Sequence, residues 1–225
     1  MQQRTVIFGA SRGLGAELAK QALAAGVPVE GWARKEERLC ALQQAGFSHQ
    51  VADLASAAGQ EKAMSHILDA LPTRLFFVAG GGPFGHFGAR PWSAHEWAWQ
   101  LSFIFPARLI HALLSHPMNQ PLPQVVLVGS AVAENAADPR AASYCAAKHA
   151  LKGLFLSLRA ESPDWDLRLF SPGYMDTEML PKNAPVRERG VYDPAQVAAE
   201  LWTWALSADN GGHRVYPIHP IQESK

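Results

Sequence analysis

Tyr144 and Lys148 stand four residues apart in the run AASYCAAKHALKGLFLSL, and on a helix this spacing places both side chains on one face. A tyrosine releases its proton only near pH ~10, but a neighbouring ammonium group favours the phenolate and lowers the tyrosine pKa. Such a tyrosine can act as a general acid or base near neutral pH. The same spacing also occurs by chance on surface helices, so the role of the pair depends on the rest of the chain.

The turn GASRGLG, with glycines at positions 9, 13 and 15, is a second stretch that could bind a ligand. A glycine-rich turn from a strand into a helix lets the backbone approach a pyrophosphate, which then meets the unpaired N–H groups of the helix N-terminus. The spacing G-x-x-x-G-x-G differs from the common G-x-G-x-x-G, but the mechanics are the same. The alternative is that the glycines serve only a tight turn. The position at the first strand-to-helix junction favours a dinucleotide site.

The end of the second expected strand bears on which dinucleotide is bound. An NAD site usually has an acidic residue there, about 20 residues after the glycines, that holds the 2′-hydroxyl of the adenosine ribose. This chain has WARK at positions 32–35, and Glu30 lies earlier, within the expected strand. Arg34, and Arg12 in the glycine turn, could pair with a 2′-phosphate. The sequence therefore favours NADP(H), unless both arginines are solvated surface residues.

The elements that must position these residues follow a regular alternation. Short apolar runs predict strands, and longer segments with helical periodicity, two of them ended by glycine, predict helices. Strands that are apolar on both faces and alternate with helices indicate a parallel sheet covered on two sides. We predict one doubly wound α/β domain (a Rossmann fold) over residues 1–225, with about seven strands and helices on both faces. The expected strands are 4–9, 27–33, 49–54, 74–80, 124–130, 166–173 and 213–218, and the expected helices are 13–26, 35–46, 58–71, 93–115, 143–161 and 194–208.

Composition argues against several other classes of protein. Lys+Arg and Asp+Glu balance at 20 each, and without a basic run we expect no nucleic-acid or anionic-membrane partner. Two cysteines, Cys40 and Cys145, make a disulfide framework improbable. We find no signal-peptide pattern and no apolar run of the ~18–20 residues that a membrane span needs, so we expect a soluble, cytoplasmic protein. None of the nine histidines pairs at ligand spacing with carboxylates or cysteines, so no metal site is expected.

Taken in order, these motifs closely resemble the short-chain dehydrogenase/reductase family over nearly the whole chain. GASRGLG is similar to the family's cofactor turn, and Pro172-Gly173 followed by Thr177 is similar to the segment that covers the nicotinamide. The resemblance implies that an NADP(H) cofactor is bound by a set of residues from six parts of the chain. These are Gly9, Ser11, Arg12, Gly13, Leu14, Gly15, Arg34, Asp53, Leu54, Ala79, Gly80, Tyr144, Lys148, Pro172, Gly173, Met175 and Thr177.

The catalytic residues are also implied by the resemblance. Ser130, fourteen residues before Tyr144, would orient the substrate carbonyl, Tyr144 would exchange the proton, and Lys148 would lower the tyrosine pKa and bind the nicotinamide ribose. Ser102, in SFIFP, stands where the family has a catalytic asparagine. Further departures are Phe8 in place of a threonine, and Phe77-Val78 in place of the two asparagines of the family's Asn-Asn-Ala-Gly. The region around these residues must be stabilised in another way.

The resemblance implies an NADP(H)-dependent oxidoreductase, a carbonyl reductase or alcohol dehydrogenase, which acts on a small-molecule carbonyl or alcohol and forms a homodimer or homotetramer. Two alternatives stay open. One is an NADP(H)-binding sensor or scaffold with weak or no turnover, and the other is an isomerase or dehydratase without net consumption of cofactor. The substrate is not specified, although the stretch at 178–194, here named the lid segment, would lie at its entrance.

Two groups of side chains have a second interpretation. Trp92, Trp97 and Trp99 could line a pocket or pack a helix, and packing is favoured. Asp176 and Glu178 could cap a short helix rather than contact a ligand.

Overall fold

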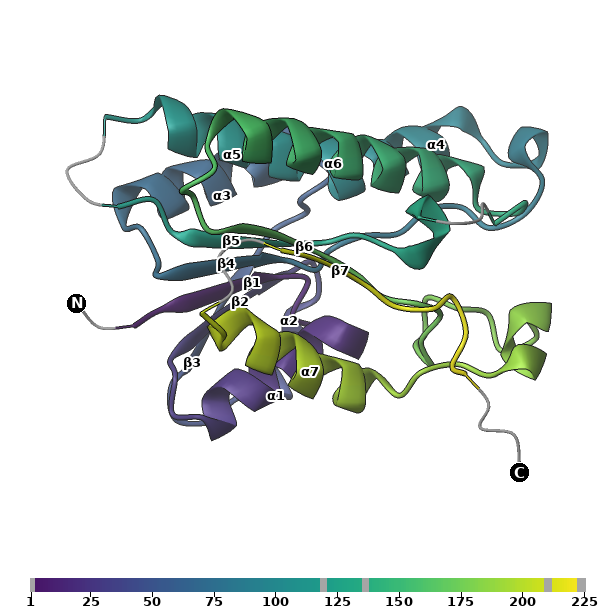
Figure 1. The fold of residues 1–225 in the computed structure, drawn as a ribbon, viewed down its shortest axis with the longest axis horizontal. Coiled ribbons are helices and arrows are strands. Elements are labelled where there is room, and N and C mark those ends of the chain that lie inside the picture. Colours follow the sequence, from purple (N-terminus) through teal and green to yellow (C-terminus); the bar gives the residue numbers. More distant parts are fainter. Residues whose placement is uncertain (1–2, 118–120, 135–137, 209–211, 222–225) are drawn as a thin grey trace.

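The computed structural model describes residues 3–117, 121–134, 138–208 and 212–221. In this part of the chain seven strands form one parallel sheet in the order β3-β2-β1-β4-β5-β6-β7 (Figure 1). This confirms the predicted doubly wound parallel sheet. The strands are β1 (Thr5–Phe8), β2 (Val29–Ala33), β3 (Phe47–Val51), β4 (Arg74–Phe77), β5 (Gln124–Val128), β6 (Leu167–Ser171) and β7 (His213–Val215).

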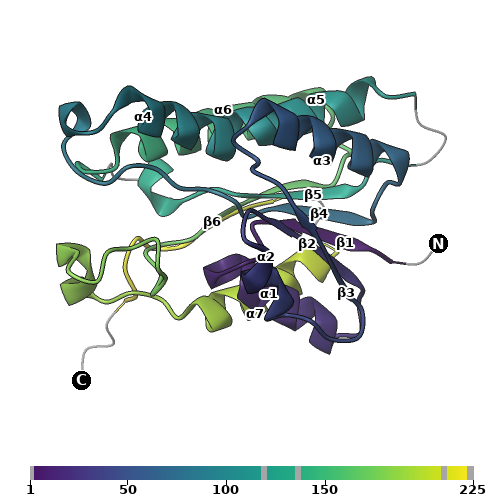
Figure 2. The same cartoon turned by 180° about the vertical axis from the view of Figure 1, so that it is seen from behind.

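Helices cover both faces of the sheet, as Figures 1 and 2 show from opposite sides. One face carries α1 (Gly13–Ala24), α2 (Glu36–Cys40) and α7 (Pro194–Leu206). The other carries α3 (Ala57–Asp69), α4 (Trp92–Trp99), α5 (Phe105–Ser115) and α6 (Ala142–Glu161). The central strands are buried on both sides, which explains why they read as continuous apolar runs in the sequence.

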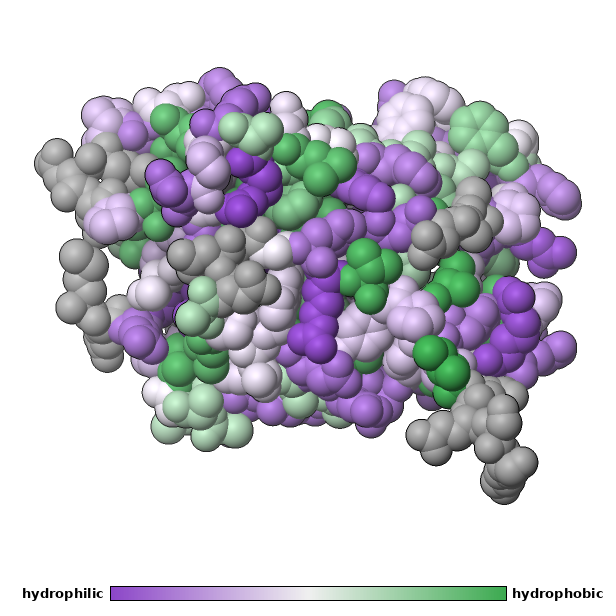
Figure 3. Space-filling model, in the orientation of Figure 1, coloured by the Kyte–Doolittle hydropathy of each residue, from purple (hydrophilic) through white to green (hydrophobic). Residues whose placement is uncertain are grey.

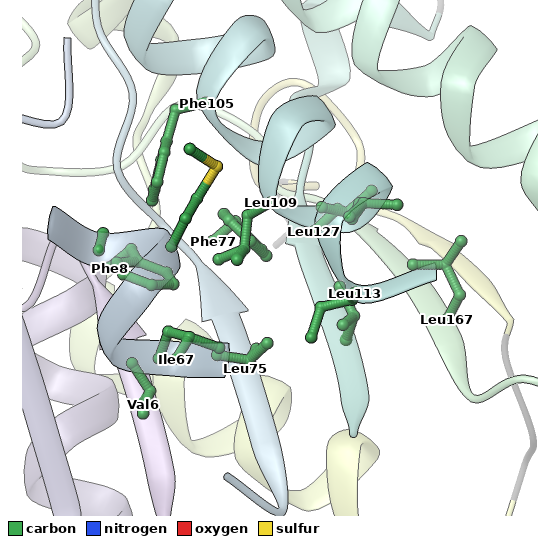
Figure 4. Packing of buried hydrophobic residues seen from close by; sticks show 14 of the residues in the cluster. Val6, Phe8, Ile67, Leu75, Phe77, Phe105, Leu109, Leu113, Leu127 and Leu167 are labelled. Carbon is green, nitrogen blue, oxygen red and sulfur yellow. The ribbon is translucent and has the colours of Figure 1, made fainter. Parts of the chain in front are cut away.

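Two hydrophobic clusters, one on each face, hold the layers together. Successive side chains of a strand point to opposite faces, so Val6 and Phe8 of β1 belong to one cluster and Ile7 to the other. In the first cluster Phe8 packs on Phe77 and Phe105, with ring centroids 5.1 and 4.9 Å apart (Figure 4). Contacts of this kind join β1, β4 and α5 into one packed unit.

The carboxyl ends of β1 and β4 mark the point where the strand order reverses, and open α/β sheets bind ligands at such a point. Here the amides of Val78 and Ala79 both donate to the carbonyl oxygen of Phe8, at 3.0 and 2.7 Å. These bonds and the Phe8–Phe77 contact stabilise the region where the sequence departs from the motifs that it resembles. The two unexpected phenylalanines, Phe8 and Phe77, therefore pack on each other.

The helix predicted over 93–115 is interrupted. Between α4 and α5 the chain forms a π-helical segment, Gln100–Ile104, and the amide of Phe105 bonds to the carbonyl of Gln100 five residues earlier. Pro106 follows directly, and proline has no N–H to continue an α-helical ladder. Because single π turns inside helices are frequent at functional sites, the place of Ser102 on this segment is notable.

The chain between β2 and α3 also differs from the prediction. The helix expected over 35–46 ends at Cys40, because Phe47 is buried and must begin β3, where it pairs with Val29. The strand expected over 49–54 ends at Val51. Beyond it Asp53 accepts a hydrogen bond from the amide of Ala55 at 3.1 Å, which turns the chain into α3.

The surface facing the viewer in Figure 3 shows small, separate hydrophobic patches among hydrophilic residues. Across the residues that the structure describes, no helix combines the length and the apolar character needed to cross a membrane.

Gly15 provides a test of the close packing at the glycine turn. A Cβ at Gly15 would lie 2.1 Å from the carbonyl oxygen of Gly9, whereas a Cβ at Gly153, in the exposed face of α6, would meet nothing within 4 Å. We expect Gly15→Ala to lower the free energy of unfolding by about 1–3 kcal/mol or more through overpacking. Gly153→Ala should raise it by roughly 0.5–1 kcal/mol, because alanine is the better helix former. Urea unfolding measures the free energy of unfolding of both variants. Equal changes in the two variants would contradict the close approach of Gly15 to the carbonyl oxygen of Gly9.

Candidate active site

A pocket lies at the carboxyl ends of the central strands, between the glycine turn after β1 and the segment after β6. Seventeen of the residues expected to bind cofactor or catalyse line this one pocket, and Gly15 and Ser102 do not. The lining residues predicted from the sequence are Gly9, Ser11, Arg12, Gly13, Leu14, Arg34, Asp53, Leu54, Ala79, Gly80, Ser130, Tyr144, Lys148, Pro172, Gly173, Met175 and Thr177.

The glycine turn forms an open backbone cradle for an anion. Helix α1 begins at Gly13 with no side-chain cap and no acidic residue in its first turn, so its first N–H groups and the positive end of its dipole have no side chain to satisfy them. A Cβ at Gly9 would lie 2.6 Å from the amide nitrogen of Ala79, so only glycine fits there. Gly15 is needed for the turn itself. These features fit the pyrophosphate of a dinucleotide.

The pocket is also lined by Arg34 and Trp97. The guanidinium carbon of Arg34 lies 5.1 Å from the centre of the Trp97 ring, a cation–π contact. Trp97 lines the pocket, so the preference for packing is wrong for this residue. Trp92 and Trp99 do not line this pocket, and they contact each other edge to face at 5.3 Å.

Glu178 joins the lid segment to the glycine turn. Its Oε2 accepts hydrogen bonds from Arg12 at 3.2 Å and from Arg38 at 2.8 Å, and the two guanidinium groups hold the pKa of the carboxyl below its usual value. Sequence reasoning missed Arg38 and offered only a capping role for Glu178. Arg38 lies in the first turns after Arg34, close to the end of β2 that bears on the cofactor preference, and this proximity in sequence is a signal that could have drawn attention to it.

Lys148, in α6, lines the pocket and is buried. Its Nζ donates to the carbonyl oxygen of Val128 at 2.6 Å and lies 5.6 Å from the centre of the Tyr144 ring. Burial disfavours the charged form of an amine and lowers the pKa of Lys148 to about 8. The ammonium group is thus close to losing its proton at physiological pH.

Tyr144 has the opposite shift from the one predicted. Burial raises its pKa to about 12, while a hydrogen bond with Ser130 acts to lower it. The prediction that Lys148 lowers this pKa is wrong for the structure, because the ammonium group is directed to a backbone carbonyl and desolvation of the phenol dominates. At neutral pH the phenol therefore carries its proton.

Ser102 lies behind the pocket wall. Its hydroxyl accepts a hydrogen bond from the amide of Gly81 at 3.2 Å and lies 3.3 Å from the carbonyl of the same residue. A Cβ placed on Gly80 would be 3.2 Å from the Nζ of Lys148 and 3.6 Å from the Oγ of Ser102, so both polar groups lie against this glycine. The structure thus places Ser102 under the loop that contains Gly80 and Gly81 and not at the pocket surface.

His95 is a residue whose contact the sequence did not predict. Its Nδ1 lies 2.6 Å from the Oγ of Ser143, the residue before Tyr144, and its Nε2 lies 3.1 Å from the carbonyl oxygen of Phe87. The buried ring therefore links the loop before α4 to the first turn of α6. A lone histidine in the sequence carries no signal for such a contact.

Comparisons with known proteins agree with this arrangement. A family model described as short chain dehydrogenase matches residues 3–188. An uncharacterised oxidoreductase of Mycobacterium tuberculosis is 26% identical over 230 residues, which cover 91% of this chain and 90% of that protein.

Solved structures show the same fold. A short-chain dehydrogenase from Sphingobium yanoikuyae in complex with NADPH has a TM-score of 0.85 at 23% identity, covering 97% of this chain and 89% of that one. An alcohol dehydrogenase from the archaeon Thermococcus sibiricus complexed with 5-hydroxy-NADP has a TM-score of 0.80 at 20% identity, covering 98% and 99%. Since the family model matches most of the sequence, this chain belongs to the short-chain dehydrogenase family.

Proposed function

We propose that the chain is an NADP(H)-dependent oxidoreductase that transfers hydride between the nicotinamide and a carbonyl or secondary alcohol group. The observation that carries the proposal is the presence of Ser130, Tyr144 and Lys148 in one pocket with the glycine turn. Family membership supports the oxidoreductase part. The proposal includes one catalytic domain over residues 1–225 and assembly into a homodimer or homotetramer, as the resemblance implies.

The preference for the phosphorylated cofactor rests on charge at the adenosine end. Glu30, the acidic residue of β2, is buried and bound to Arg4 at 3.2 Å and to the indole of Trp32 at 2.7 Å, so it is not available to a ribose hydroxyl. Arg34 and Arg12 line the pocket and are suited to a 2′-phosphate. Two structural neighbours carry NADPH and 5-hydroxy-NADP, which adds support.

The protonation states favour the direction of carbonyl reduction. When bound, NADPH supplies the hydride, and the protein supplies position and electrostatic stabilisation. Tyr144 holds its proton at neutral pH and can donate it to a developing alkoxide as a general acid. Ser130, hydrogen-bonded to Tyr144, would orient the carbonyl oxygen. Lys148 would add positive charge beside the tyrosine.

Tyr144→Phe tests the proton donor. Removal of the hydroxyl should lower kcat for carbonyl reduction by about 10²–10⁴-fold, the usual contribution of a general acid, and leave the Kd for NADPH nearly unchanged. Tyr216→Phe is the matched control, because the Tyr216 hydroxyl bonds to Glu200 outside the pocket. Steady-state kinetics and fluorescence titration measure the two quantities. Retained turnover in Tyr144→Phe would overturn the assigned role, and a wild-type protein that binds NADPH without turnover of any carbonyl would support the sensor alternative.

Arg34→Asp tests the choice of cofactor. A carboxylate at this position would repel a 2′-phosphate and accept from a ribose hydroxyl, so the NADPH/NADH affinity ratio should fall by roughly 10-fold or more. Lys20→Asp makes the same change of charge on α1 outside the pocket and should leave the ratio unchanged. An unchanged ratio in Arg34→Asp would show that Arg34 does not contact the phosphate.

The lowered pKa of Lys148 predicts a dependence of stability on pH. Between about pH 8 and 10.5 the unfolded lysine keeps its proton while the folded one has lost it, so the free energy of unfolding rises with pH. Relative to Lys148→Met, the wild type should gain on the order of 3 kcal/mol across this range and show little change below it. Denaturant unfolding of both proteins at pH 7, 9 and 10 measures the difference. A constant or falling difference would mean that Lys148 stays charged.

A further inference from the structure

Arg12 and Arg34 line the pocket at its proposed adenosine end, and Arg12 is already paired, together with Arg38 of α2. Arg12 and Arg38 both donate to a single carboxylate oxygen, the Oε2 of Glu178. The guanidinium group of Arg34 instead lies over the ring of Trp97. The two paired arginines come from the glycine turn and α2, and the carboxylate comes from the start of the lid segment. One anion of the protein thus stands where an anion of the cofactor is proposed to bind.

The backbone around Glu178 holds its carboxylate at this place. The methyl group of Thr177 lies against Gly13, 3.1 Å from where a Cβ would stand. On the other side Arg187 donates to Asp176 at 2.7 Å and to the carbonyl of Leu180 at 2.9 Å, and so ties the lid segment together. The chain around Glu178 is therefore held on both sides, and its carboxylate is held by the ion pairs with Arg12 and Arg38.

The ion pairs themselves remain open to solvent. The side chains of Glu178, Arg12 and Arg38 are 59%, 46% and 34% exposed. Exposed pairs contribute little to stability, so a stronger anion from solution can replace the carboxylate at small cost. A phosphate dianion carries more charge than a carboxylate and matches the guanidinium fork with two oxygens.

We propose that Glu178 is a residue that determines cofactor specificity, because its carboxylate competes with the 2′-phosphate of NADPH for Arg12 and Arg38. The inference rests on the proposed NADP(H) function and deepens it. NADPH must displace the carboxylate and then bind near an unpaired negative charge, which reduces its affinity. NADH has a hydroxyl at the 2′ position, gains nothing from the two arginines and leaves the ion pairs in place. Glu178 therefore narrows the difference in affinity between the two cofactors.

Glu178→Gln removes the charge and keeps the shape of the side chain. It should tighten NADPH binding by about 3- to 10-fold, as expected for the loss of one competing charge at an exposed site, and leave NADH binding within about 2-fold. Glu178→Gln should likewise tighten the binding of adenosine 2′,5′-bisphosphate and leave that of AMP unchanged, because these two ligands contain only the adenosine part of NADPH and NADH. The gain should shrink in about 1 M salt, where the screening length falls to ~3 Å. Isothermal titration calorimetry measures each Kd.

Two controls isolate the effect. Glu188→Gln makes the same change of charge on the lid segment, at an exposed carboxylate with no ion pair among the described residues, and should leave all affinities unchanged. In an Arg12→Gln/Arg38→Gln background the further change Glu178→Gln should no longer improve NADPH binding. Thermal unfolding in each case checks that the variants are folded.

The outcomes separate this inference from the proposed function. A wild type that prefers NADPH, together with an unchanged NADPH/NADH ratio in Glu178→Gln, would overturn the role of Glu178 and leave the function intact. A wild type without preference for NADPH, and a Glu178→Gln protein that also shows none, would overturn both. A third outcome is that Glu178→Gln tightens the binding of the phosphorylated ligands alone. If this gain in affinity is absent in the Arg12→Gln/Arg38→Gln background, the result supports competition between the Glu178 carboxylate and the 2′-phosphate.

Discussion

The structure depends on one close approach of backbone at the carboxyl ends of β1 and β4. The carbonyl of Phe8 accepts the amides of both Val78 and Ala79, and Gly9 then passes so near Ala79 that no side chain would fit. This contact joins the two halves of the sheet where the strand order reverses. It also directs the first N–H groups of α1 into the pocket. The anion cradle, the pocket floor and the core beneath it are therefore consequences of a single packing constraint.

Aromatic packing performs, in this chain, a task that polar side chains perform in the related family. Phe8, Phe77 and Phe105 contact one another beneath the site, and all three are buried. A threonine or asparagine there would bring hydrogen-bonding groups that need partners. The backbone amides already have theirs in the Phe8 carbonyl. Apolar side chains at positions 8 and 77 thus leave no unsatisfied polar group, which explains how both departures coexist with the ordinary fold.

The ionisable groups at the two ends of the pocket differ in how far they are exposed to solvent. Around Tyr144 and Lys148 desolvation dominates, so the phenol keeps its proton and the amine is close to losing one. Around Arg12, Arg38 and Glu178 the groups are exposed, and the charges balance one another at little cost. Under the proposed function, the first environment suits proton transfer and the second suits the exchange of one anion for another.

The sequence by itself determined the alternation of strands and helices, the glycine turn and the spacing of Tyr144 and Lys148, because periodicity and local spacing are properties of neighbouring residues. Through the resemblance it also indicated seventeen residues that line one pocket. Only the tertiary structure decided the rest. Arg12 and Glu178 are 166 positions apart, and their pairing depends on how the lid segment crosses the glycine turn. The pKa directions at Tyr144 and Lys148 depend on burial by distant elements. Burial and long-range contact arise from packing, so no local pattern contains them.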